Sequence, residues 1–177
     1  VKFRKNVWAR PQILVQVEGS NREQIHQVLE QERDRIINFL VQYDRQRLTD
    51  SYTASKDLEI QKMMAENHHI RLSIPRGYNV DVSSDNYTSV SIETPDFSQV
   101  IHVYEYPAES AGQLQNGLIL EKRNAFTKKY VKGPNENSYM TTSMVYPPIF
   151  YDLKRDNMEI VEVRGLWELE GGFMGGP

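Results

Sequence analysis

The histidines are the residues of this chain best suited to acid–base or metal chemistry, and their spacing favours neither. His68 and His69 are adjacent, so in a strand their imidazoles would point to opposite faces. No two histidines have the His-x-His or His-x-x-x-His spacing that places two imidazoles on one ion. We therefore predict no metal site. We expect all four histidines to be solvent-facing or locally hydrogen-bonded: His26, His68, His69 and His102.

Nucleophilic catalysis also lacks its usual sequence elements. The chain has no cysteine, which excludes thiol catalysis, disulfides and thiolate metal sites. The serines of residues 138–143 lack a Gly-x-Ser-x-Gly elbow or a Ser-x-x-Lys pair. That segment fits an ordinary strand, so a hydrolase that uses it together with His102 is only the remote alternative. The sequence also has no phosphate-binding glycine loop, and we predict no catalytic residue and no cofactor.

An aromatic group in the middle of the chain is the candidate ligand-binding site. Alternate residues of a strand share a face, so His102, Tyr104 and Tyr106 would lie together. Such a face could bind a small molecule or a carbohydrate, and its other interpretation is a half-exposed sheet surface. The candidate site residues are Tyr78, Tyr87, His102, Tyr104 and Tyr106.

The two tryptophans, Trp8 and Trp167, are the side chains most costly to expose. Core packing is therefore the default expectation for both. The alternative is a binding platform for a sugar ring.

Charge and hydropathy exclude further classes. The 177 residues include 21 Lys and Arg against 24 Asp and Glu, giving a net charge of -3 and a pI near 5.8. Binding to a phosphate backbone needs a basic surface, so we expect no nucleic acid partner. No stretch approaches the roughly 18 apolar residues of a membrane-spanning helix. Basic residues are nevertheless concentrated at residues 2–10 and 122–132, on either side of an acidic block.

Helical periodicity dominates the first third of the chain. Ser20 followed by Glu23 forms a capping box, which predicts a helix that starts at Asn21. Apolar residues then recur at three- and four-residue steps, which predicts one amphipathic helix to about residues 48–52. A second helix is expected over residues 56–66. The apolar stripe of the first helix contains Ile25, Val28, Leu29, Ile36, Phe39, Leu40 and Tyr43.

Short alternating runs separated by turn residues predict antiparallel strands in the rest of the chain. Ser110 and Gln113 resemble a second capping box, ahead of a helix that would reach about Val131. This order of elements predicts an α+β fold, an antiparallel β-sheet with long amphipathic helices packed on one face, in a single domain over residues 1–177. The strands are expected at residues 70–74, 79–83, 87–93, 100–106, 139–145, 149–153 and 158–167.

Six short motifs, taken in order, resemble one protein family. They are Trp8 to Gln12, Glu121 to Arg123, Lys129 to Pro134, Ser138 to Thr142, Arg164 to Trp167 and Phe173 to Pro177. The family is the domain of unknown function DUF4837, whose members look like lipoproteins of Bacteroidetes-type Gram-negative bacteria. The resemblance implies a location in the periplasm or anchored to the outer membrane. It also implies that this chain is a fragment of a longer mature chain, without its N-terminal part and its C-terminal end.

The family has no established activity, so the resemblance supplies no catalytic residues. We expect a non-enzymatic cell-envelope domain that acts as a binding or interaction module, with an envelope protein or a glycan as its partner. Membrane association would come only through a lipid anchor outside this fragment. The alternative is a small-molecule or carbohydrate-binding domain that uses the tyrosine-rich face. A concave pocket lined by those tyrosines would favour the small ligand, whereas a flat apolar patch would favour a protein partner.

Overall fold

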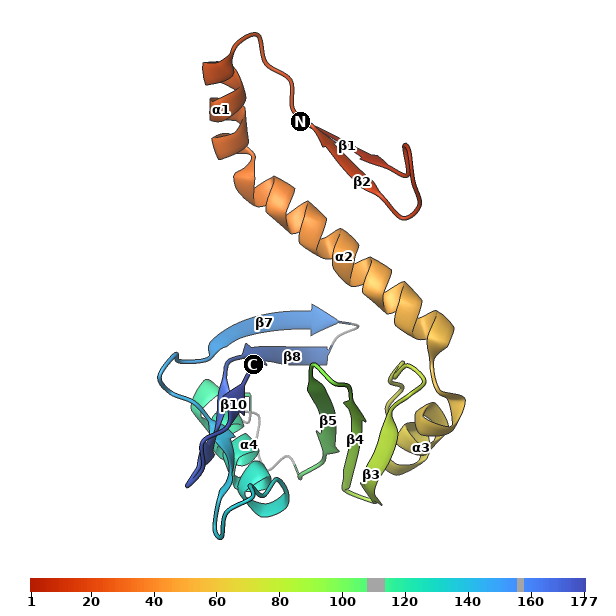
Figure 1. Ribbon diagram of the computed structural model, residues 1–177, viewed down its shortest axis with the longest axis vertical. Helices are drawn as coiled ribbons and strands as arrows, with labels where there is room; N and C mark the ends of the chain where they lie inside the picture. The colour runs from red at the N-terminus through yellow and green to blue at the C-terminus, as the bar shows by residue number, and fades with distance from the viewer. Residues whose placement is uncertain (108–113, 156–157) are drawn as a thin grey trace. The chain divides into compact units, whose positions relative to one another are not determined.

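The computed structural model describes residues 1–107, 114–155 and 158–177. Helices and antiparallel sheets alternate along these residues, which confirms the α+β class. Residue contacts divide the chain into two compact units: unit 1 is Val1–Tyr106 and unit 2 is Pro107–Pro177 (Figure 1). The predicted capping box at Ser110 and Gln113 lies outside the described residues.

Unit 1 opens with a two-stranded hairpin, β1 (Lys2–Lys5) and β2 (Ile13–Gln16). The strands pair antiparallel, with Phe3 opposite Val15. The loop between them has its own hydrogen bonds, because the Asn6 amide donates to the Gln12 carbonyl at 2.9 Å. The Trp8 amide donates to the Gln12 side-chain oxygen at 3.0 Å. The loop is therefore a defined structure, held mainly by Gln12.

Two helices, α1 (Arg22–Gln31) and α2 (Arg33–Ser55), replace the single predicted one. Glu32 ends α1 and precedes α2, and no glycine or proline marks the break in the sequence. The predicted capping box is shifted by one residue. The Asn21 side chain accepts from the Gln24 amide at 2.8 Å, and Gln24 in turn accepts from the Ser20 amide. The longer Gln24 side chain thus takes the role predicted for Glu23.

The hairpin covers one face of α2. The rings of Phe3 and Phe39 lie 4.2 Å apart, and the Lys5 ammonium lies 5.4 Å from the centre of the Tyr43 ring. The Arg35 guanidinium also lies over Phe3. Phe39 and Tyr43 are four residues apart, so they lie on the same face of the helix. This face points to the hairpin and leaves the rest of α2 uncovered by it.

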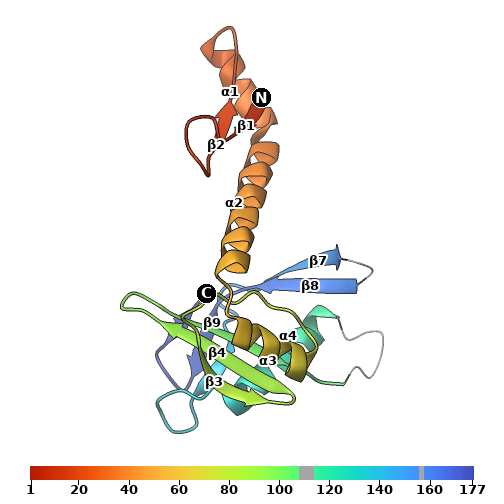
Figure 2. The same cartoon turned by 90° about the vertical axis from the view of Figure 1, so that its right-hand side faces the viewer.

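The short helix α3 (Leu58–His68) covers the meander of unit 1, a three-stranded antiparallel sheet. The sequence suggested instead that the long first helix would pack on this sheet. Its N-cap Asp57 accepts hydrogen bonds from the amides of the first turn. The sheet order is β3-β4-β5, all antiparallel (Figures 1 and 2). The strands are β3 (Asn79–Ser84), β4 (Tyr87–Glu93) and β5 (Ser98–Tyr104). The buried cluster between helix and sheet consists of Ile60, Met64, Ile74 and Val90.

The strand predicted at residues 70–74 is wrong. His69 takes a left-handed conformation at the end of α3, with φ of 54°. The segment that follows bonds to the connection between α2 and α3, because the Asp57 amide donates to the Ile74 carbonyl at 2.8 Å. The backbone therefore closes the α2–α3 connection, and the meander starts only at β3.

The described part of unit 2, residues 107, 114–155 and 158–177, contains one helix and two small sheets. The helix α4 (Asn116–Tyr130) packs against β6 (Tyr139–Thr142), and the first sheet has the order β10-β9-β6. The second sheet is an antiparallel hairpin of two longer strands. The remaining strands are β7 (Ile149–Arg155), β8 (Met158–Arg164), β9 (Trp167–Glu170) and β10 (Gly175–Gly176).

Candidate functional site

Four of the five predicted site residues lie on the sheet face opposite α3. The register places Tyr87 of β4 directly opposite Tyr104 of β5, and the Tyr87 hydroxyl lies 3.2 Å from His102 Nδ1. The rings of Tyr104 and Tyr106 stack with their centres 6.1 Å apart. The neighbouring residues of β5, Ile101 and Val103, pack on the α3 side. The predicted shared face of His102, Tyr104 and Tyr106 is therefore present.

Tyr78 does not join this group. It lies before β3 and packs against the buried cluster beneath α3, and its hydroxyl donates a hydrogen bond to the Gln99 side-chain oxygen. Burial, and secondarily the nearby Tyr52, raises the pKa of Tyr78 above its usual 10.0. Tyr87, for its part, is only 4% exposed. The ligand-binding role of the group stays a prediction.

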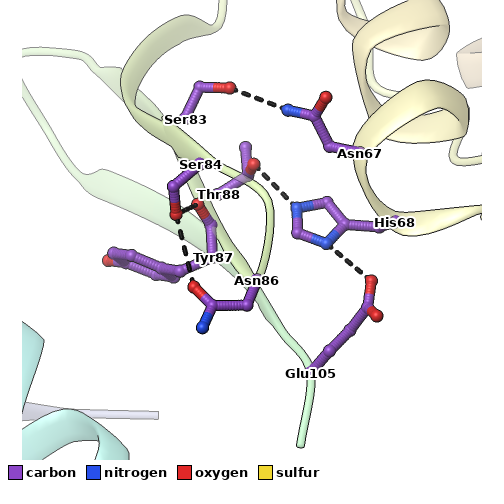
Figure 3. Close-up of polar contacts among 8 residues, drawn as sticks. All are labelled: Asn67, His68, Ser83, Ser84, Asn86, Tyr87, Thr88 and Glu105. Atoms are coloured by element: carbon purple, nitrogen blue, oxygen red, sulfur yellow. Dashed lines mark hydrogen bonds and ion pairs between the residues drawn. The ribbon is translucent and has the colours of Figure 1, made fainter.

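A buried polar cluster that the sequence did not reveal is centred on His68 (Figure 3). Its Nδ1 lies 2.8 Å from Glu105 Oε1 and its Nε2 lies 2.8 Å from Thr88 Oγ1. A carboxylate only accepts, so Nδ1–H donates to Glu105, whereas a hydroxyl can donate or accept and so pairs with Nε2 in either protonation state of the ring. Both ring nitrogens of His68 therefore have a hydrogen-bond partner. The expectation that the histidines are solvent-facing or locally bonded is wrong for His68, because its side chain is fully buried and its partners are distant in sequence.

The His68 cluster has the connectivity of a hydroxyl–imidazole–carboxylate relay, but its hydroxyl cannot reach a substrate. Thr88 has no solvent exposure, and its hydroxyl points to the imidazole (Figure 3). Catalysis by such a relay requires an accessible nucleophile. Asn67 adds a hydrogen bond to Ser83 of β3 at 3.0 Å, next to the imidazole. The cluster therefore joins the end of α3 to the sheet and has a structural role.

The hydroxyl-rich segment of unit 2 is also used for structure. Ser138 is 1% exposed, and its hydroxyl donates to the Asn135 carbonyl at 2.7 Å. Thr142 Oγ1 lies 2.8 Å from Asn124 Oδ1 and accepts from Arg123 at 2.8 Å. These bonds connect β6 to α4 and to the turn before β6. The sequence of unit 2 contains no histidine that could act as a base beside them.

A small cavity lies in unit 2 at the start of β9. Its volume is about 200 Å³. Arg123, Thr142 and Trp167 are among the residues that line it. The wall also includes apolar residues, among them Leu120, Pro148 and Leu166. This mixture of an aromatic ring, a hydroxyl and a fixed guanidinium suits a small polar ligand.

Among the helices that the structure describes, α2 carries the most exposed large apolar residues. The structure describes every residue of α1 and α2, and neither helix contains a buried side chain. Beside the face covered by the hairpin runs a row of large apolar residues, which we call the α2 stripe. Each of its members is between 41% and 47% exposed: Ile37, Leu40, Val41, Leu48 and Tyr52.

The hairpin loop exposes Trp8, contrary to the predicted core position. The indole is 76% exposed, because the bonds that hold the loop use its backbone and Gln12 and leave the ring outside. The prediction fails because the chain before α1 forms only a two-stranded hairpin, which has no interior that could cover the ring.

The described residues contain no group of three or more histidines, aspartates and glutamates arranged to hold a metal ion. Within the same residues, no helix has both the length and the apolar composition to cross a membrane.

The chain belongs to the DUF4837 family, a domain of unknown function whose family model matches residues 57–177. This match confirms the resemblance drawn from the motifs, and five of the six lie within it. The Trp8 to Gln12 motif lies in residues 1–53, which match the model of a second domain of unknown function, DUF8532. No curated protein and no solved structure matches the chain.

The first match ends at residue 53, in the last turn of α2, and the second begins at residue 57, just before α3, whereas residue contacts divide the chain after Tyr106. The single domain over residues 1–177 stays a prediction.

Proposed function

We propose that the chain is a non-enzymatic interaction module of a cell-envelope lipoprotein and that the α2 stripe binds a protein partner. The observation that carries this proposal is the stripe itself. Apolar residues scattered singly over a surface are ordinary, but a contiguous row of large ones is typical of an interaction site. The stripe is contiguous because its members recur at helical spacing along one side of α2.

The chemistry of the stripe favours a protein over a glycan. Four of its five residues are aliphatic, and a helix face is convex. Sugar sites are concave and combine aromatic rings with several fixed polar groups. The tyrosine-rich sheet face supports a glycan site less well, because Tyr87 is buried at its centre and Tyr78 lies on the opposite face.

Site-specific photo-crosslinking in cells tests the proposal. A photoreactive residue replaces Val41 in the stripe or, as the matched control, Gln42, which is also exposed but points about 100° away around the helix. We expect a protein adduct from position 41 and little from position 42, and we expect Leu48→Asp to remove it. Absence of any adduct from position 41, or equal adducts from both positions, would contradict the proposal.

The envelope location rests on the family motifs and is tested separately. The full-length protein, expressed in its native host with a labelled fatty acid, should incorporate the label and fractionate with the membranes. An unlabelled precursor that remains with the soluble cytoplasmic fraction would overturn the lipoprotein assignment. The interaction surface would survive that result, since it depends only on α2.

A second candidate function is small-ligand binding at the unit 2 cavity, favoured by the position of Trp167 in its wall. A thermal-shift panel of sugars, peptidoglycan fragments and carboxylates tests it. A ligand at 100 times its dissociation constant adds about 2.7 kcal/mol, which raises the unfolding midpoint by about 5 to 10 °C at this size. The shift should disappear in Trp167→Leu and persist in Phe173→Leu, the control for a fully exposed ring.

A further inference from the structure

The exposed loop of the β1–β2 hairpin suits a partner surface that is both anionic and apolar. We propose that the side of this hairpin turned away from α2 rests on an anionic lipid membrane, with the Trp8 indole inserted at the interface. The surface is separate from the α2 stripe, so the contact goes beyond the proposed function and does not depend on it. It is a membrane contact of the folded chain itself, in addition to the lipid anchor expected from the family motifs.

Strand pairing gives the hairpin two faces. Phe3 lies on the face that meets α2, because its ring lies 4.2 Å from that of Phe39. Successive residues of a strand point to opposite faces, so Arg4 points away from α2. Leu14 pairs directly with Arg4 and therefore shares its face.

The loop continues the face that carries Arg4. An open cleft of about 550 Å³ is lined by Val7 and Trp8 of the loop and by Arg4 and Leu14 of the strands. We call these four residues the outer face of the hairpin. The indole is 76% exposed, and Val7 is also exposed. The hydrogen bonds within the loop fix the backbone beneath the ring, so the outer face presents the indole from a defined structure.

The hairpin is basic, in contrast to the whole chain. Residues 1–17 contain four basic side chains and no acidic one, whereas the chain has a net charge of -3. Two of the four, Arg4 and Arg10, are exposed, and within the described residues no acidic side chain pairs with either. Lys2 pairs with Glu18 at the end of the hairpin away from the loop. The cations nearest the loop are therefore available to an external anion.

An indole beside arginines favours a membrane interface over other anionic partners. Tryptophan is enriched at the depth of the lipid headgroups, where its ring meets the apolar layer and its N–H stays near water. Basic residues beside it are attracted to anionic headgroups. A soluble polyanion would use the same cations but would gain little from the aliphatic Val7 and Leu14. The combination of charge and contiguous apolar surface on the outer face therefore indicates a lipid surface.

Co-sedimentation of the 177-residue chain with vesicles tests the contact. We expect binding to vesicles made of phosphatidylglycerol and phosphatidylcholine in equal parts, and little binding to pure phosphatidylcholine. Trp8→Ala should weaken the binding by about tenfold, because it removes most of the inserted apolar surface. The loop bond of Trp8 uses its backbone amide, so this variant should keep its fold by circular dichroism.

Phe173→Ala is the matched control, since it removes a fully exposed ring of unit 2. It should bind the vesicles like the wild type. Failure of the wild type to bind anionic vesicles, or equal binding by Trp8→Ala, would overturn the proposal.

Removal of charge tests the role of the arginines. Arg4→Gln and Arg10→Gln together should weaken binding to the anionic vesicles by at least about tenfold, since each basic residue near such a surface contributes about fivefold. Arg71→Gln removes an exposed charge outside the hairpin and should leave the affinity within about twofold. A loss in Arg71→Gln as large as that of the hairpin variant would mean that net charge sets the affinity, which contradicts the proposal.

Tryptophan emission tests the insertion. Anionic vesicles should shift the emission of the wild-type chain to shorter wavelength, and lipids brominated on the upper acyl chain should quench it. Trp8→Phe should show neither change, because only Trp167 then emits. Vesicle binding without a response from Trp8 would mean that the hairpin does not insert. An equal response to heparin in place of vesicles would assign the outer face to a soluble polyanion, and either result overturns the proposal.

Discussion

Consecutive helices of unit 1 differ in what covers their apolar faces. In α3, 11 residues long, Ile60, Met64 and His68 are buried; in α2, 23 residues long, no residue is buried. Both carry apolar residues at helical spacing. The α3 face meets a three-stranded sheet, whereas the hairpin covers only part of α2. The comparison teaches that helical periodicity defines an apolar face, and that only the tertiary partner decides whether this face becomes core or interface.

The largest effect should come from removing a core side chain of α3. Met64 is completely buried, so Met64→Ala should lower the free energy of unfolding by about 2 to 5 kcal/mol. The matched change in the stripe, Leu48→Ala, should cost about 0.5 kcal/mol or less in dilute protein. Urea unfolding of both variants measures the difference. Similar losses in the two would mean that the α2 stripe is already covered within one chain.

A smaller loss is expected from the buried polar cluster. His68→Ala removes both hydrogen bonds of the imidazole and leaves the Thr88 hydroxyl buried without this partner, at a cost of about 2 kcal/mol. His26→Ala is the control, since its side chain is 75% exposed. Thermal unfolding at neutral pH compares them. If His68→Ala were as stable as the control, the cluster would not hold α3 on the sheet.

The N-caps of α3 and α1 provide a matched pair of variants with the next largest expected effect on stability. Asp57→Ala should cost about 1 kcal/mol of global stability, because α3 is part of the core. Asn21→Ala removes the corresponding bond of α1 and should reduce helix content without shifting the unfolding midpoint of the core. Circular dichroism and the emission of an extrinsic probe at α3 separate the two responses. A shift of the midpoint by Asn21→Ala would show that residues 1–55 and the α3 core unfold as one.

The smallest effect concerns pH. The pKa of Tyr78 is raised in the folded chain, by burial first and then by Tyr52, so its stabilising contribution is complete below about pH 10 and is lost as the pH rises beyond it. Tyr78→Phe should therefore flatten the decline of stability at alkaline pH, and the exposed control Tyr146→Phe should not. Stability measured at pH 8 and above pH 10 compares the slopes. If stability fell equally with pH in the wild type and in Tyr78→Phe, the burial assigned to Tyr78 would be contradicted.

The sequence predicted the features that depend on local pattern. Alternation and turn residues placed β4 at its observed limits of 87 and 93, and the spacing of apolar residues placed α3 within two residues of its ends. The motifs identified the family. Each of these signals is contained within a short window of residues.

Features that depend on distant partners were not predictable in the same way. His68 bonds to residues 20 and 37 positions away, and nothing near it in the sequence indicates a buried imidazole. Tyr78 follows Gly77, whose φ of 104° turns the chain, so alternation along β3 could not place this tyrosine on the correct face. The exposure of Trp8 depends on how little structure surrounds the hairpin. The apolar stripe predicted from periodicity includes Phe39 and Tyr43, which contact the hairpin, and it shares only Leu40 with the α2 stripe, so the exposed row itself was not predicted.

Amide hydrogen exchange of α2 and α3 tests the central claim most directly. The claim is that α3 buries its apolar face within one chain, whereas the α2 stripe stays exposed and is free to bind a protein partner. We predict that α2 amides exchange faster than α3 amides in dilute protein. Equal protection of the two helices would contradict the account.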